Sequence, residues 1–257
     1  MITVRELHKV FGSNTVLDGL NLEVPRGESV VILGRSGSGK SILLKQIIGL
    51  IRPDAGAIEI DGTDIVGLDY DDLSRLRHRM AMLFQQAALF DSMTVGQNIG
   101  LALQERGRMD EATIAAKVAE ALEVVKLPGI EDMRPASLSG GMRKRVGLAR
   151  AIAVDPEYML YDEPTAGLDP VTAVQINEMI RHLQERYRMT SIVVTHDLHS
   201  AFAVGDRICM LHEGRIRVAG TPDAFRRSDD PIVRGFLEPG TAATASVTTS
   251  TTTPSTT

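Results

Sequence analysis

Apolar residues are spaced differently along the chain, and each spacing predicts a different kind of element. Residues 2–10 and 16–24 alternate between apolar and polar positions, which is typical of half-buried strands. Residues 29–33 form an unbroken apolar run, typical of a parallel strand that is buried on both faces. A glycine-rich loop follows, and the stretch 41–48 then predicts a helix that ends at Gly49.

The rest of the chain alternates between helical and strand patterns. From residue 95 to about 150, apolar side chains recur at helical spacing. Strand patterns return at 158–161 and 191–194, and a helix is predicted over 171–187 between them. Strands separated by crossover helices indicate a parallel sheet. We therefore predict an α/β fold with a helical insertion over about residues 91–153.

Composition narrows the class of protein. The chain has 257 residues, of which 43% are hydrophobic and 24% charged, as in an ordinary globular domain. No run approaches the roughly 18 apolar residues that span a bilayer. A net charge of −5 and an aromatic content of 4% argue against nucleic acid as a partner. The single cysteine, Cys209, closes no internal disulfide and fits a reducing cytoplasm. Residues 239–257, rich in Thr and Ser, predict a disordered tail.

Residues 34–41 match the G-x-x-x-x-G-K-[ST] loop that wraps phosphate groups. Its glycines let backbone N–H groups turn towards phosphate oxygens, and the N-terminus of the next helix adds partial positive charge. We expect Lys40 to reach the β- and γ-phosphates and the Ser41 hydroxyl to bind Mg²⁺. The predicted nucleotide-binding residues of this loop are Gly34, Arg35, Ser36, Gly37, Ser38, Gly39, Lys40 and Ser41.

A later apolar strand ends in two adjacent carboxylates, Asp162 and Glu163. The first suits Mg²⁺, either directly or through water, and the second is placed to act on a water molecule. An acidic pair at the end of a strand is ordinary by itself. Together with the phosphate loop, the pair indicates the metal-binding and base half of a nucleoside triphosphatase.

Further segments make residues 2–236 resemble the ATP-binding cassettes of ABC transporters. The resemblance implies a P-loop NTPase fold over residues 2–238, with a RecA-like parallel core, an N-terminal antiparallel β subdomain and the helical insertion. It also implies hydrolysis of ATP to ADP and phosphate, with ATP and Mg²⁺ as ligands. The matching segments are Leu138-Ser139-Gly140-Gly141-Met142 for the signature L-S-G-G-Q, Phe84-Gln85 for the Q-loop, Thr195-His196-Asp197 for the switch histidine and Ala166-Gly167-Leu168-Asp169 for the D-loop.

The resemblance assigns roles around the nucleotide. Glu163 is implied to activate water, His196 to contact the γ-phosphate and Gln85 to sense metal and water, with Lys40 completing the catalytic set. The implied Mg²⁺ ligands are Ser41, Gln85 and Asp162. Phe11, where Tyr is common, is implied to stack on the adenine with Val16 beside it; the core of a strand is the alternative place for Phe11.

The signature itself is predicted to be an anion site. Ser139 stands at a helix N-cap position, and Gly140 and Gly141 leave backbone N–H groups bare. In the family each signature closes over the nucleotide of a second cassette, so these three residues are implied to act in trans in a dimer, with Asp169 at the seam. Residues 143–145, all basic, read as a solvated face of the helix that follows.

Three segments, 82–90, 140–146 and 161–170, are similar to the ATPases of Mla/Mce-type lipid transporters. This closer resemblance implies phospholipid or other lipid transport, integral membrane permease subunits, a Mce-type substrate-binding protein and a peripheral place on the cytoplasmic face of the inner membrane. Apolar residues at 87–90 fit contact with a permease helix, and equally the core of the helical insertion.

Other classes of protein are the alternatives. A soluble ABC protein of DNA repair or translation needs a long heptad insertion, metal-binding cysteines or a second cassette, and the sequence contains none of these. A small-molecule kinase does not need the signature at 138–142. A cassette of another importer, for an amino acid, an osmolyte or a metal, is not distinguished by the sequence, because partner subunits select the substrate.

Overall fold

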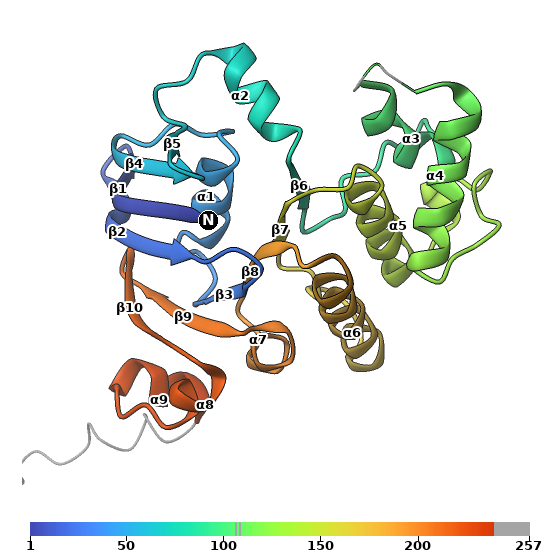
Figure 1. The fold of residues 1–257 in the computed structure, drawn as a ribbon. Coiled ribbons are helices and arrows are strands. Elements are labelled where there is room, and N and C mark those ends of the chain that lie inside the picture. Colours follow the sequence, from blue (N-terminus) through green and yellow to red (C-terminus); the bar gives the residue numbers. More distant parts are fainter. Residues whose placement is uncertain (106, 108, 239–257) are drawn as a thin grey trace, which may run out of the picture.

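The structure is a computed structural model that describes residues 1–105, 107 and 109–238, in which two sheets are combined with helices and the antiparallel sheet lies at one side (Figure 1). The first sheet has 4 strands in the order β2-β1-β4-β5, and its paired strands are all antiparallel. Ile2, Val4 and Leu7 are buried as predicted, but the alternation is broken, because Thr3 is buried as well and the pairing with β2 shifts after Val4. The strands of this sheet are β1 (Ile2–Phe11), β2 (Asn14–Val24), β4 (Ala55–Ile60) and β5 (Thr63–Asp64).

The second sheet has 6 strands in the order β10-β9-β3-β8-β7-β6, and it is parallel except for the antiparallel pair of β9 and β10. Every residue of β3, β7 and β8 is buried, as the unbroken apolar runs predict. Because these strands run in one direction, their carboxyl ends meet at one edge of the sheet. The strands are β3 (Ser29–Leu33), β6 (Met80–Leu83), β7 (Tyr158–Asp162), β8 (Thr190–Thr195), β9 (Arg207–His212) and β10 (Arg215–Gly220).

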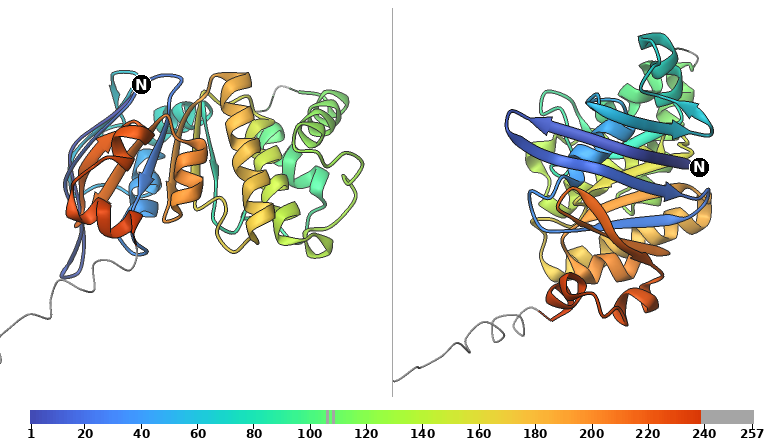
Figure 2. Two further views of the ribbon diagram at one scale, coloured as in Figure 1. Left: turned by 90° about the horizontal axis from the view of Figure 1, so that it is seen from below. Right: turned by 90° about the vertical axis from the view of Figure 1, so that its left-hand side faces the viewer.

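Helices cover both faces of the parallel sheet. Figure 2 shows the antiparallel sheet and α1 on one side, α5 and α6 on the other, and α3 and α4 beyond α5. The helices are α1 (Lys40–Ile47), α2 (Tyr70–Arg77), α3 (Val95–Glu105), α4 (Glu111–Val124), the 3₁₀ turn η1 (Pro135–Ser137), α5 (Gly140–Ile152), α6 (Pro170–Tyr187), α7 (Leu198–Val204), α8 (Pro222–Arg226) and α9 (Pro231–Leu237).

The two faces of the parallel sheet belong to two hydrophobic cores. Val31 and Leu33 of β3 face the core shared with α3 to α6, whereas Val30 and Ile32 face the core shared with α1 and the antiparallel sheet. This alternation follows from the two-residue period of a strand. Both cores extend to the carboxyl ends of these strands, since Leu33 and Leu83 belong to the first core and Phe84 packs against the second.

Most helix starts are fixed by a short polar side chain at the N-cap. Asp110, Ser139, Asp169 and Asp197 each accept a hydrogen bond from a backbone N–H in the first turn of α4, α5, α6 and α7, respectively. The helix after the phosphate loop differs, because its N-cap is Gly39 and has no side chain. The N–H groups at this helix end are therefore left for a ligand.

The predicted strands and helices are present, with ends shifted by a few residues. The sequence patterns missed α2, β6 and the short helices α7, α8 and α9. The predicted tail, 239–257, lies outside the described residues. Across the described part of the chain, no helix is both long and apolar enough to cross a membrane.

Asp61 joins the two sheets through charged partners. Its carboxylate accepts hydrogen bonds from the N-terminal amino group, Tyr158, Arg79 and Arg26. Burial raises the pKa of Asp61, but these bonds outweigh it and hold the pKa well below its usual range.

Asp61→Asn is expected to lower the free energy of unfolding by about 2 kcal/mol at pH 7, because hydrogen bonds to charged groups are lost. Asp61 has a φ of 51°, a left-handed conformation that Asn also tolerates, so backbone strain does not confuse the result. A carboxylate with a depressed pKa stabilises above the unfolded pKa, so the difference from wild type should narrow below about pH 4. Urea unfolding at pH 7 and pH 3.5 measures this difference in the free energy of unfolding.

The control is Glu59→Gln, because Glu59 pairs with the exposed Arg5. This variant should change the free energy of unfolding by less than about 0.5 kcal/mol. An equal loss in both variants would contradict the role of Asp61.

Candidate functional site

The phosphate loop follows β3 at the carboxyl edge of the parallel sheet. The ends of β7 and β8 lie at the same edge and carry Asp162, Glu163 and His196 to the loop. A cavity of about 510 Å³ opens there. It is lined by Phe11, Val16, Ser36, Gly37, Gly39, Lys40, Ser41, Ile42, Gln85, Glu163 and His196.

The loop has the backbone of an anion cradle. Gly39 has a φ of 100°, and a Cβ there would stand 2.9 Å from a side-chain carbon of Val16. A Cβ on Gly34 would stand 2.8 Å from the Leu211 carbonyl oxygen. Both positions require glycine. Ser38 Oγ is buried and has no hydrogen-bond partner among the described residues, so one polar group of the cradle is left for a ligand such as phosphate.

Lys40 lies at the centre of the cradle and is only 5% exposed. Its Nζ donates to the carbonyl oxygens of Gly34 at 2.8 Å and Arg35 at 3.0 Å, and lies 3.4 Å from Glu163 Oε1. Burial lowers the pKa of Lys40, and the Glu163 carboxylate opposes this shift. An anion beside Nζ would offset the cost of burying this charge.

Ser41 and Asp162 form the predicted metal-binding pair. The Ser41 hydroxyl donates to Asp162 Oδ1 at 2.7 Å, so two oxygens of the kind that Mg²⁺ prefers lie side by side. Asp162 is buried at the end of β7, and Gln85 lines the same cavity. These residues fit Mg²⁺ bound through few protein oxygens together with phosphate oxygens.

Glu163 lies between two nitrogen groups. Its Oε1 faces Lys40, and its Oε2 lies 2.9 Å from His196 Nδ1. Glu163 has a φ of 47°, a left-handed conformation that costs a non-glycine residue about 1–2 kcal/mol. Its backbone N–H donates to the Val194 carbonyl at 2.9 Å, which ties the strained residue to β8.

The prediction that residues 143–145 form a solvated basic face is wrong for Lys144. It was expected on the solvated face of α5, yet it is 4% exposed and its Nζ donates to the backbone carbonyls of Gln85 and Glu163. Burial lowers the pKa of Lys144 to about 8, against the opposing influence of Asp162 and Glu163. Helical spacing contained the signal, since Lys144 shares a face with Leu148 and Ala151, both buried.

Phe11 is not a core residue. It ends β1 with 46% of its surface exposed and lines the mouth of the cavity with Val16. The Lys9 ammonium lies 5.3 Å from the centre of its ring. The alternative of a buried strand position is therefore wrong, and the ring is free to stack on a ligand.

The signature residues lie outside their own chain's phosphate cavity. Ser139 and Gly140 are exposed at the start of α5, where Ser139 Oγ accepts from the Met142 N–H at 3.2 Å. Gly141 is buried, and a Cβ there would stand 2.5 Å from Thr172. Asp169 caps α6, and the hydrogen bond from the Thr172 hydroxyl lowers its pKa. The structure thus brings neither the signature nor Asp169 to the phosphate loop of the same chain.

A second hollow adjoins the phosphate cavity. This hollow, of about 660 Å³, shares Glu163 and His196 with the cavity and is also lined by Arg35 and by residues 165–168. The His196 side chain is 51% exposed on this side, whereas Glu163 is buried beside it. Such an opening fits a site that is completed in trans.

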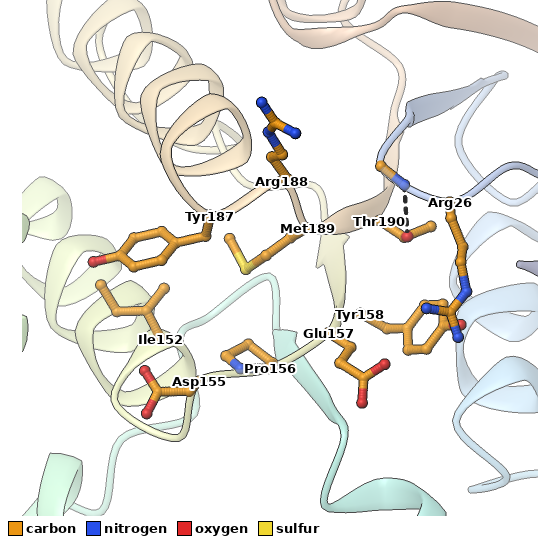
Figure 3. Close-up of a pocket in the computed structure, with 11 residues that line it drawn as sticks. Arg26, Ile152, Asp155, Pro156, Glu157, Tyr158, Tyr187, Arg188, Met189 and Thr190 are labelled. Atoms are coloured by element: carbon orange, nitrogen blue, oxygen red, sulfur yellow. Dashed lines mark hydrogen bonds between the residues drawn. The ribbon is translucent and has the colours of Figure 1, made fainter.

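Another cavity, of about 330 Å³, lies at the opposite, amino-terminal edge of β7 and β8 (Figure 3). Tyr187 and Met189 lie above Ile152 and Pro156, and the Gly27 N–H donates to Thr190 Oγ1 at 2.9 Å. It contains none of the predicted site residues. The cavity at the phosphate loop is therefore the candidate site.

Comparisons with known proteins agree with this geometry. A family model described as ABC transporter matches residues 17–166. The chain is 42% identical over 236 residues to the probable ribonucleotide transport ATP-binding protein mkl of Mycobacterium leprae (strain TN), covering 92% of this chain and 68% of that protein. It is 40% identical over 237 residues to the Fe(3+) ions import ATP-binding protein FbpC of Photorhabdus laumondii, covering 92% and 66%.

Two further matches extend the comparison. Protein TRIGALACTOSYLDIACYLGLYCEROL 3, chloroplastic, of Arabidopsis thaliana is 39% identical over 253 residues, with 92% of this chain and 73% of that protein covered. A dimeric ATP-binding cassette in a post-hydrolysis state, bound to ADP and phosphate, superposes with a TM-score of 0.80 at 33% identity, covering 86% of this chain and 99% of that one. The chain spans about two thirds of the length of mkl and FbpC.

The chain therefore belongs to the ABC transporter family and is an ATP-binding cassette. This confirms the predicted P-loop α/β fold, the class of enzyme, an ATPase, and ATP with Mg²⁺ as its ligands. The relatives named for ribonucleotides and for iron are as similar to this chain as the relative named for a lipid. The family is thus shown, and the transported substrate is a separate question.

Ser139→Arg tests whether the signature acts in trans. We expect one isolated subunit to bind ATP as wild type does, while turnover falls at least about 10-fold, because a bulky cation occupies the place of the other chain's phosphate. Loss of the N-cap costs about 1 kcal/mol, which a melting curve will register. Nucleotide titration and steady-state hydrolysis measure the two effects, with Ser137→Arg, two residues earlier and also exposed, as the matched control. If ATP binding by single subunits drops as far as turnover, the signature belongs to the chain's own site.

Proposed function

We propose that this chain hydrolyses ATP to drive phospholipid or other lipid transport between membranes, as the ATPase subunit of an Mla/Mce-type transporter. The observation that carries the ATPase site is the convergence of Lys40, the Ser41–Asp162 pair and the Glu163–His196 pair at one cavity. Lipid as the substrate rests on the resemblance of residues 82–90, 140–146 and 161–170. It is supported by the Arabidopsis relative, whose name includes that of a lipid.

The chain's own residues divide the work of hydrolysis. The loop N–H groups and Lys40 bind the phosphates, and Ser41 and Asp162, with Gln85, would hold Mg²⁺, which supplies positive charge against the phosphates when bound. Glu163 is the base: its carboxylate accepts the proton of the attacking water as that water bonds to the γ-phosphorus. The bond between the γ-phosphorus and the bridging oxygen breaks, and ADP leaves with that oxygen and the electron pair. His196 holds Oε2 of Glu163 in place and contacts the γ-phosphate.

Two copies and a membrane partner complete the proposed assembly. The exposed signature end of α5 closes over the second copy's nucleotide, and each copy docks on an integral membrane permease subunit at the cytoplasmic face of the inner membrane. Phe90 is 52% exposed and available to such a permease, whereas Ala87 is buried in the core. Ala87 thus has the core position that was one prediction for this segment, and contact of Phe90 with the permease is the proposal. A Mce-type protein is the proposed substrate carrier.

A cassette of another importer is the second candidate. The relative named for Fe(3+) import is 40% identical to this chain, which is no less similar than the relative named for a lipid. The phosphate cavity does not separate these substrates, because it contacts ATP and not the cargo.

Copurification with the native membrane partner separates the two. A tagged chain carrying Glu163→Gln, which is expected to stay closed on ATP, is isolated from mild detergent, and its partners are identified by mass spectrometry. The wild-type complex is then reconstituted, and its ATPase rate is compared with phospholipid vesicles, Fe(3+) or an amino acid supplied to the carrier side. Stimulation by phospholipid with a Mce-type partner supports the proposal. Stimulation by Fe(3+) or an amino acid with a soluble binding protein overturns it.

A further inference from the structure

Lys144 is a buried cation that the mechanism above does not use. Its neighbours on α5 point elsewhere: Arg143 donates to the Leu138 carbonyl, and Arg145 donates to the Gln175 side chain. Lys144 alone of these three basic residues is buried, with 4% of its surface exposed. Burying an ammonium group costs free energy unless the group is hydrogen-bonded, so the partners of Lys144 indicate what it does.

The partners of Lys144 are the backbones of two site residues. Its Nζ donates to the Gln85 carbonyl and, at 3.2 Å, to the Glu163 carbonyl. Leu83 and Tyr161 are paired across β6 and β7, so Gln85 and Glu163 each follow two residues beyond one pair of the ladder. One ammonium thus bridges the two chain segments that leave adjacent strands and carry the water-activating and metal-sensing side chains.

A second cation of α5, Arg150, also binds the segment that follows β6. Arg150 donates to the carbonyls of Ala87 and Ala88, each at 2.7 Å. Both alanines are left-handed, with φ values of 60° and 46°, a conformation that non-glycine residues adopt only when their surroundings fix it. Two cations of α5 therefore bind the segment after β6: Lys144 binds the carbonyl of Gln85, and Arg150 binds those of Ala87 and Ala88.

Glu163 also requires contacts that fix its backbone conformation. Its φ of 47° is also left-handed, and its carbonyl oxygen is the one that Lys144 binds. The Ala166 N–H also donates to this carbonyl, at 3.2 Å, so Lys144 is one of two donors that fix the Glu163 peptide plane. Of these two donors, only Lys144 also binds the Gln85 carbonyl.

We propose that Lys144 is a positioning residue for ATP hydrolysis, which fixes the distance between Gln85 and Glu163 by bridging their backbone carbonyls. The proposal rests on the roles assigned above to these two residues. Lys144 is not among the residues that line the phosphate cavity, so it acts on turnover and not on nucleotide binding. Misplacement of a reacting group by about 1 Å is enough to cost a large factor in rate.

Lys144→Met tests this, since Met has a long, flexible side chain and no donor. We expect kcat for ATP to fall at least about 10-fold, with the KM and the nucleotide Kd within about twofold of wild type. Lys144→Arg, which restores donors to the same carbonyls, is expected to recover most of the lost kcat. Lys117→Met is the matched control, because Lys117 lies on α4 and pairs with Asp155 away from the site; its kcat should stay at the wild-type value.

Melting temperatures and a second variant separate positioning from folding. If Lys144→Met does not fold, Lys144→Gln keeps a donor of shorter reach and is judged by the same kcat and KM criteria. Loss of kcat at a retained ATP-induced rise in melting temperature, with rescue by Arg, supports the proposal. A kcat within twofold of wild type overturns it, as does an equal loss in Met and Arg that follows their melting temperatures. Glu163→Gln is assayed beside them. If Glu163→Gln hydrolyses ATP at the wild-type rate, the proposed ATPase site is wrong. If Glu163→Gln is inactive and Lys144→Met is active, only the positioning role of Lys144 is wrong.

Discussion

Glu163→Gln is expected to bind ATP as tightly as wild type and to turn it over roughly 10²–10⁴ times more slowly, the usual cost of removing an acid–base group. Gln has nearly the same shape, so its side chain can still lie between Lys40 and His196, and the Ser41–Asp162 pair is untouched. Gln does not accept the proton of water. ATP binding still closes two chains, but nothing reopens them.

The variant is therefore expected to accumulate as an ATP-bound dimer. Size-exclusion chromatography with Mg²⁺ and ATP, against ADP, shows the dimer, and a phosphate-release assay gives the rate. Glu157→Gln is the matched control, because Glu157 directly precedes the same strand and pairs with Arg79 at its opposite end. Near wild-type hydrolysis by Glu163→Gln would remove Glu163 from the mechanism.

Lys40→Ala is expected to raise the Kd for ATP by roughly 10²-fold or more. Two hydrogen bonds from a charged group are lost at the phosphates, at about 1.5 kcal/mol each, which corresponds to about that factor. Lys40 donates to the loop carbonyls of Gly34 and Arg35, so the loop itself fixes the position of its ammonium group in the cradle.

Isothermal titration calorimetry with ATP and Mg²⁺ measures the affinity. Lys45→Ala, one and a half turns further along α1, makes the same chemical change outside the cavity and should leave the Kd unchanged. An unchanged Kd in Lys40→Ala would show that residues 34–41 are not the nucleotide site. Far-UV circular dichroism of both variants checks that α1 still forms.

The residues that sequence reasoning placed correctly are those whose role follows from local pattern. The buried run at β3 and the glycine spacing after it predict a strand, a tight loop and a helix, because each depends only on neighbouring residues. Phe11 needed the fold to decide between core and ligand contact, since both places accept an aromatic ring. Its 46% exposure excludes the core, and stacking on a ligand stays a prediction.

The residues that were missed depend on contacts between distant segments. Helical spacing placed Lys144 on the face of Leu148 and Ala151, but its partners are backbone carbonyls, which have no sequence signature. Its burial follows from α5 packing on β6 and β7, whose pairing no local pattern encodes. β6 itself is only 4 residues long and was missed for a related reason, as so short an apolar run does not separate a strand from a helix segment.

The donors that α5 extends to the segment after β6 also set what can be exchanged between related cassettes. Lys144 and Arg150 bind carbonyls of Gln85, Ala87 and Ala88, and the same helix begins with the signature that we propose closes over a second copy's nucleotide. A chimera that takes residues 139–150 from a relative replaces Lys144 and Arg150 but keeps the original residues 85–88 whose carbonyls they bind. Residues 85–88 and 139–150 are therefore best treated as a single inherited block, and hybrid cassettes divided between them should assemble yet couple poorly.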